Sequence, residues 1–115
     1  MGVASIPYGL PAQAAVVSPT EFKSCCAALY ESDWAHLLLG ESLHPGGLAL
    51  TERLGVALGL GPDKKVLDAA CGAGASAVFL AERFGCRVVG VDFSPRLIAA
   101  ARARAADRSV SAQVD

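Results

Sequence analysis

The chain has 115 residues, of which 53% are hydrophobic and 18% are charged, and its formal net charge is −1. This composition is typical of one soluble globular domain and excludes a disordered or fibrous chain. Ten Lys and Arg residues stand against eleven Asp and Glu residues, with no basic run that would attract nucleic acid or an anionic membrane. We therefore expect a small-molecule partner, no nucleic-acid partner and no membrane partner.

Targeting signals are not evident in the chain. Glu21 is the first charged residue, and three prolines before residue 20 interrupt any apolar helix there, unlike a secretory signal. No stretch supplies the roughly 20 uninterrupted apolar residues of a membrane span. The four cysteines fit neither a CxxC metal site nor a disulfide-rich scaffold. We expect a cytoplasmic protein with reduced thiols.

The first half of the chain is expected to be helical. Residues 1–20 show no clear period and are predicted to form a flexible leader. From Thr20, as N-cap, apolar residues recur at helical spacing and predict one amphipathic helix that ends near Gly40. A loop at 44–47 separates it from a second helix over about 48–58, and residues 21–60 form an N-terminal helical unit.

Strand and helix patterns alternate in the second half. Strands are predicted at 65–70, 87–92 and 110–114, and helices at 75–84 and 95–107, the second capped by Ser94. This order predicts an α/β fold, the first βαβαβ half of a Rossmann-like, doubly wound parallel sheet. Three strands cannot make both sides of a binding cleft. We therefore expect residues 61–115 to be a half truncated at its C-terminus.

A glycine-containing turn between the first strand and its helix carries the chemistry. Gly72 and Gly74 let the backbone turn sharply and remove the Cβ atoms that would keep a ligand away. The free N–H groups of the following helix favour an anion. Asp92, which ends the next strand, is placed to accept hydrogen bonds from a ribose diol. A nucleoside ligand is predicted.

The first-strand acid distinguishes between two nucleosides. Residues 72–77 also satisfy the loose G-x-G-x-x-G/A pattern of dinucleotide sites. The glycines therefore do not distinguish a dinucleotide from another nucleoside ligand. Asp68, at the end of its strand, would repel a pyrophosphate but attract a ligand that carries a sulfonium and an ammonium. This favours S-adenosylmethionine over NAD, with no metal required.

The segment 66–74, followed by 89–94, resembles the first two motifs of class I S-adenosylmethionine-dependent methyltransferases. The resemblance covers residues 60–115 and implies methyl transfer to a small-molecule acceptor. It also implies cofactor-binding roles. The turn residues would hold the methionine part, Asp92 the ribose, Phe93 the adenine ring and Asp115 the adenine amino group; the turn residues are Asp68, Ala70, Cys71, Gly72 and Gly74. The family most often has glycine where this chain has Ala70.

The segment 25–51 resembles the lead-in of bacterial methyltransferases akin to the arsenite and ubiquinone/menaquinone-type enzymes. That resemblance implies that the N-terminal helices form a lid over the methyl donor, which Tyr30 touches. It identifies neither the methyl acceptor nor a catalytic residue. We expect the catalytic residues to lie outside this chain.

Simpler interpretations of these residues stay open. A strand-end acid can cap a helix or pair with arginine. Cys25 and Cys26 suit a soft metalloid, but neighbours on a helix diverge and cysteine is often a small core residue. His44 is a general base or a loop histidine bonded to backbone. For the whole chain, the alternatives are an NAD-binding oxidoreductase half and a non-catalytic truncated product.

Overall fold

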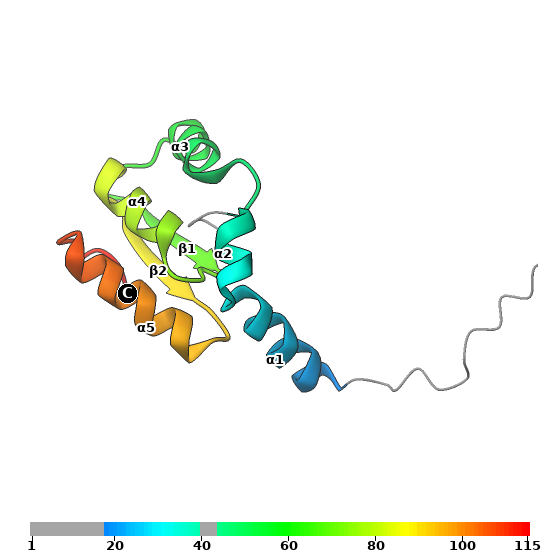
Figure 1. Ribbon diagram of the computed structural model, residues 1–115. Helices are drawn as coiled ribbons and strands as arrows, with labels where there is room; N and C mark the ends of the chain where they lie inside the picture. Colours follow the sequence, from blue (N-terminus) through cyan, green and yellow to red (C-terminus); the bar gives the residue numbers. More distant parts are fainter. Residues whose placement is uncertain (1–17, 40–43) are drawn as a thin grey trace, which may run out of the picture.

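The computed structural model describes residues 18–39 and 44–115 (Figure 1). Most of the predicted leader therefore lies outside the described residues. The elements follow the chain in the order α1 (Pro19–Tyr30), α2 (Asp33–Leu39), α3 (Gly47–Ala57), β1 (Lys65–Ala69), α4 (Ala75–Phe84), β2 (Arg87–Val91) and α5 (Pro95–Asp107). The predicted alternation of strands and helices in the second half is confirmed as far as α5.

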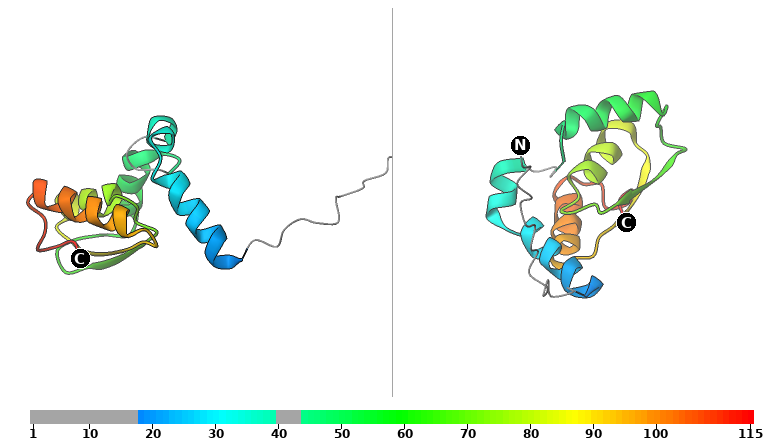
Figure 2. Two further views of the ribbon diagram at one scale, coloured as in Figure 1. Left: turned by 60° about the horizontal axis from the view of Figure 1, so that its bottom comes forward. Right: turned by 90° about the vertical axis from the view of Figure 1, so that its right-hand side faces the viewer.

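The two strands form a parallel sheet in which Lys65 lies opposite Arg87 and Ala69 opposite Val91. Helices α4 and α5 cover the same face of this sheet, and α3 packs on α4 (Figure 2). The carboxyl ends of both strands point toward α1 and α2 (Figure 1). This edge is where a parallel α/β sheet usually binds its ligand.

The predicted third strand is largely absent. Only Val114 bridges to the sheet, in parallel with Val88 of β2, and residues 111–113 form a turn. The backbone N–H groups of Gln113 and Val114 both donate to the carbonyl of Val110, at 2.9 and 3.1 Å. These local hydrogen bonds hold residues 110–114 in a turn, and among residues 110–115 only the backbone groups of Gln113 and Asp115 hydrogen-bond to β2. The prediction of a strand over 110–114 was wrong up to residue 113.

The predicted single N-terminal helix is two helices. The N–H of Ser32 donates to the carbonyl of Leu29, and its hydroxyl accepts from the N–H of Ala35 at 3.3 Å. Ser32 thus ends the first helical run and starts the second, as short polar side chains do when they compete with the helix backbone. Apolar spacing continues across this break, and it therefore misled the prediction.

The N-cap of α1 is Ser18 rather than Thr20. Its hydroxyl accepts from the N–H of Glu21 at 3.2 Å, and the Glu21 carboxylate accepts from the N–H of Ser18 at 2.9 Å. This reciprocal pair is a capping box, with Pro19 at the first helical position. The helix starts two residues inside the segment predicted as leader.

The core lies on one face of the sheet only. It joins the inner sides of α4 and α5 to β2, through Ala77, Val78, Leu80, Ala81, Cys86, Val88, Ala105 and Val110. On the other face Leu67, Val89 and Val91 are exposed. The nearly continuous apolar sequence of β2 predicted cover on both faces, and in the described part of the chain the second face has none.

Candidate functional site

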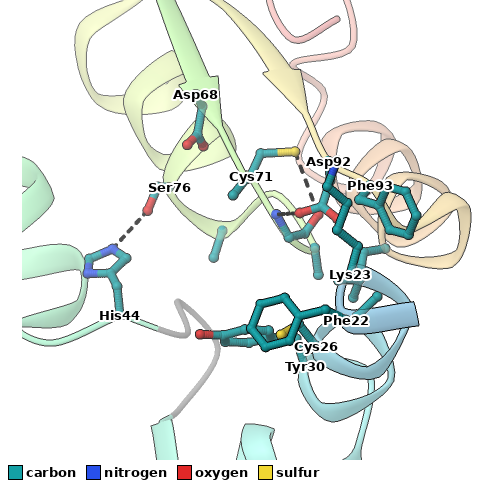
Figure 3. Close-up of a pocket in the computed structure, with 16 residues that line it drawn as sticks. Phe22, Lys23, Cys26, Tyr30, His44, Asp68, Cys71, Ser76, Asp92 and Phe93 are labelled. Carbon is teal, nitrogen blue, oxygen red and sulfur yellow. Dashed lines mark hydrogen bonds between the residues drawn. The ribbon is translucent and has the colours of Figure 1, made fainter. Parts of the chain in front are cut away.

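A pocket of about 370 Å³ lies at the carboxyl ends of the strands. The turn after β1 and the N-terminal residues of α4 form its floor, Asp92 and Phe93 form one side, and α1 lies across it (Figure 3). Seven of the nine predicted cofactor residues line this pocket: Tyr30, Asp68, Ala70, Cys71, Gly72, Asp92 and Phe93. The fold thus brings these residues together from distant parts of the sequence.

The turn between β1 and α4 is built from left-handed backbone. Gly72 and Gly74 have φ of 55° and 76°, and Ala70 has φ of 61°. Ala70 therefore adopts a backbone conformation that favours glycine. This agrees with the glycine that the methyltransferases resembled by this segment most often have at the same position. The N–H of Gly74 donates to the Cys71 carbonyl at 3.0 Å, which makes the turn tight.

Gly74 does not line the pocket. It faces α5, where an added Cβ would lie 2.8 Å from the Cβ of Ala101. The absence of a side chain at Gly74 thus permits close packing of two helices, whereas Gly72 lines the pocket itself. Of the two glycines expected to admit a ligand, only Gly72 borders the pocket.

Asp92 already holds two backbone groups. Its Oδ2 accepts from the N–H of Gly72 at 2.8 Å and its Oδ1 from the N–H of Ser94 at 2.9 Å. The carboxylate therefore joins the ligand turn to the start of α5, which is the helix-capping interpretation of a strand-end acid. Each oxygen has further lone pairs, so the same side chain can also accept from a ligand.

One oxygen of the Asp68 carboxyl group is buried without a donor. Among residues 18–39 and 44–115, no group donates a hydrogen bond to its Oδ2. Burial raises the pKa of this carboxyl, the nearby His44 opposes the rise, and the charge of Asp92 adds to it. A buried carboxylate oxygen without a partner costs free energy, and a cationic donor in the pocket would relieve that cost.

His44 reaches across the pocket to the first turn of α4. Its Nδ1 lies 3.2 Å from the carbonyl oxygen of Pro45, which is the predicted backbone contact. Its Nε2 also lies 3.1 Å from the hydroxyl of Ser76 and 3.4 Å from that of Thr51. Sequence reasoning missed Ser76, although a polar residue in the first helical turn after a glycine turn was an available signal.

Helix α1 forms the wall opposite the turn. Phe22, Lys23, Cys26 and Tyr30 line the pocket from this helix. At its C-terminal end the hydroxyl of Ser94 donates to a carboxylate oxygen of Glu31, and Ser94 is only 1% exposed. This hydrogen bond fastens α1 beside Asp92.

Asp115 lies outside the pocket. With Gly74 it lines a smaller cavity of about 80 Å³ between the sheet and α5. Its backbone pairs with β2, donating to the carbonyl of Val88 at 2.9 Å and accepting from Gly90 at 2.8 Å. The expected place of Asp115 in the cofactor pocket is therefore not what the structure shows.

Two of the arginines on α5, Arg96 and Arg102, are exposed. Arg104 is an exception. Its Nε donates to the carbonyl oxygen of Ala73 at 3.1 Å and so supports the ligand turn from behind.

The four cysteines are free thiols. Burial raises the pKa of Cys71, and the charges of Asp68 and Asp92 raise it further, which disfavours a nucleophilic thiolate in the turn. Cys26 lines the pocket whereas Cys25 does not.

Within residues 18–39 and 44–115, no three His, Cys, Asp or Glu side chains are grouped to hold a metal ion. No helix in those ranges is long and apolar enough to cross a membrane.

Comparison with known proteins shows that the second half of the chain is similar to methyltransferases. Residues 66–115 match the family model described as a methyltransferase domain. Over 70 residues, the chain is 39% identical to phosphoethanolamine N-methyltransferase 1 of Arabidopsis thaliana. The matched segment covers 61% of this chain and 14% of that protein. The chain spans between 14% and 24% of the length of three such curated relatives.

Solved structures agree with this assignment. One is geranyl diphosphate C-methyltransferase from Streptomyces coelicolor A3(2), in complex with Mg²⁺, geranyl diphosphate and S-adenosyl-L-homocysteine. It is 39% identical, with a TM-score of 0.53 over 57% of this chain and 25% of that one. An RNA methyltransferase from Salinibacter ruber, in complex with S-adenosyl-L-homocysteine, has a TM-score of 0.58 over 62% of this chain and 46% of that one. At 24% identity it supports the Rossmann-like fold alone.

Proposed function

We propose that this chain, whose residues 66–115 belong to the class I S-adenosylmethionine-dependent methyltransferases, binds S-adenosylmethionine in the pocket and serves methyl transfer to a small-molecule acceptor. The observation that carries the proposal is the buried Oδ2 of Asp68, which has no hydrogen-bond partner in the part of the chain that the structure describes. An ammonium group supplies the donor and the opposite charge that this oxygen lacks.

The two ends of the pocket suit the two ends of this cofactor. Asp68 lies at one end, where we assign the amino-acid part of the ligand, and Asp92 with Phe93 lies at the other, where we assign the ribose and adenine (Figure 3). Ala70, Cys71 and Gly72 contribute the turn between them, and Tyr30 covers the pocket from α1.

When bound, the cofactor would supply the methyl carbon: the acceptor would form a bond to this carbon in line with its carbon–sulfur bond, which would break and leave a neutral thioether. The residues of this chain bind and orient the cofactor, and α1 limits the access of water to it. The wall formed by α1 and Phe93 is mainly apolar, with one cation at Lys23. Two relatives are named for phosphoethanolamine and geranyl diphosphate, which supports a small-molecule acceptor here.

The division of the chain follows from these roles. We assign residues 21–60 to a helical lid, residues 61–115 to the cofactor-binding half, and residues 1–20 to a leader. The four free thiols support the cytoplasm as its compartment.

Isothermal titration with S-adenosylhomocysteine, with NADH in parallel, tests the proposal. We expect saturable binding of S-adenosylhomocysteine and none of NADH. Binding of NADH alone would assign the chain to the oxidoreductase alternative, and binding of neither ligand would support the non-catalytic product.

Asp68→Asn is the sharpest variant for this titration. Unlike Asp92, whose oxygens hold two backbone N–H groups, the buried oxygen of Asp68 has no structural partner to lose. We expect S-adenosylhomocysteine to bind roughly tenfold to a hundredfold more weakly, as for a lost hydrogen bond to a charged group. Asp107→Asn, at the exposed end of α5, is the matched control and should leave the affinity unchanged.

A further inference from the structure

We propose that Ser76 and His44 bind the carboxylate of the cofactor's amino-acid end, Ser76 as the direct donor and His44 as the residue that positions its hydroxyl. The inference rests on the function proposed above and deepens it. It concerns a histidine that lies before β1 in the sequence, outside the two motifs of the cofactor-binding turn.

The pair is held in place by a buried support. Thr51 of α3 is 7% exposed, and its hydroxyl lies 3.4 Å from Nε2 of His44 and 3.5 Å from the hydroxyl of Ser76. It also donates to the carbonyl of Gly47 at 3.3 Å, one turn earlier in its helix. His44 and Ser76 line the pocket, whereas Thr51 lies behind them.

The pair lies at the same end of the pocket as Asp68 (Figure 3). The ammonium and the carboxylate of an amino acid are attached to the same carbon. When the ammonium meets Asp68, the carboxylate must therefore lie beside it and needs donors of its own. Ser76 is in the first turn of α4, whose N-cap, Gly74, provides no side-chain hydrogen bond to compete for that position.

The contacts of the imidazole define its role. Nδ1 faces the carbonyl oxygen of Pro45, which accepts hydrogen bonds, and Nε2 faces the oxygen of Ser76. A hydrogen bond donated by Nε2 to the oxygen of Ser76 leaves the hydroxyl hydrogen of Ser76 free to donate to the carboxylate. The charged side chains of the same pocket are Asp68, Asp92 and Lys23.

A ligand without the carboxylate provides the test. Decarboxylated S-adenosylhomocysteine keeps the ammonium, the sulfur and the nucleoside. Titration of the full chain with both ligands should show that Ser76→Ala and His44→Gln weaken S-adenosylhomocysteine by about tenfold or more. The affinity for the decarboxylated ligand should change less than about twofold. Ser76→Thr keeps a hydroxyl and should keep the preference for S-adenosylhomocysteine, and Ser111→Ala, on the exposed turn after α5, should change neither affinity.

The outcomes are distinguishable. An equal loss for both ligands would overturn the proposal, because a merely structural role for the pair affects every ligand alike. Equal affinity of the unmodified chain for both ligands would overturn it as well, while leaving the proposed function intact. If the unmodified chain bound neither ligand, the proposed function itself would fail and this inference with it.

Discussion

Replacing Gly74 by alanine tests how tightly α4 and α5 pack around the ligand turn. The residue has φ of 76°, and its new Cβ would lie 2.8 Å from the Cβ and 3.1 Å from the Cα of Ala101. A left-handed alanine costs roughly 1–2 kcal/mol. Forcing an extra methyl into a packed contact costs about 1–3 kcal/mol more. We expect Gly74→Ala to lower the free energy of unfolding by roughly 2–5 kcal/mol.

Gly59 offers the matched control. Its φ is +60°, but no atom lies within 4 Å of an added Cβ. Gly59→Ala should therefore show the conformational cost alone, roughly 1–2 kcal/mol. Urea denaturation followed by circular dichroism measures both values. Equal destabilisation by the two substitutions would refute the argument, because it would mean that Ala101 does not restrict the turn.

Two further predictions concern the pocket. Because burial raises the pKa of Asp68 above its unfolded value, the folded chain binds a proton more readily, and stability should fall as pH rises through the window between the two pKa values. Urea titrations between pH 3 and pH 7 should show this fall reduced in Asp68→Asn, and an unchanged slope would argue against the buried charge. Glu31→Gln weakens the hydrogen bond from Ser94, so S-adenosylhomocysteine should dissociate several-fold faster in stopped-flow measurements. Glu52→Gln, in an ion pair between α3 and α4, is the control, and equal rates in both variants would dismiss the fastening role.

The second half of the chain could be predicted from sequence because its signals are local. Helix α4 begins after a glycine turn and ends at Gly85, and α5 begins with a serine cap followed by proline; both were predicted with their observed bounds. The two acids at the strand ends were placed in one pocket by the parallel topology alone. In these elements a few neighbouring residues determine the backbone.

Contacts between distant residues could not be predicted. The hydrogen bond between His44 and Ser76 joins residues 32 positions apart, and no local pattern indicates it. The packing role of Gly74 depends on where α5 crosses the turn, which the spacing of glycines does not reveal. The second function of Asp92, as an acceptor for two backbone groups, appears only when the turn and α5 meet.

The hydrogen bond from Ser94 to Glu31 also has a consequence for the order in which the chain folds. The two residues are 63 positions apart, and Ser94 takes its place only when β2 has paired with β1 and α5 has begun. During synthesis from the N-terminus, α1 is therefore complete as a helix long before it has an anchor. Closing so long a loop costs entropy that only the assembled sheet can offset. The wall that covers the pocket is thus the first part of the described chain to be synthesised, and it is anchored by Glu31 only after Ser94 has taken its place.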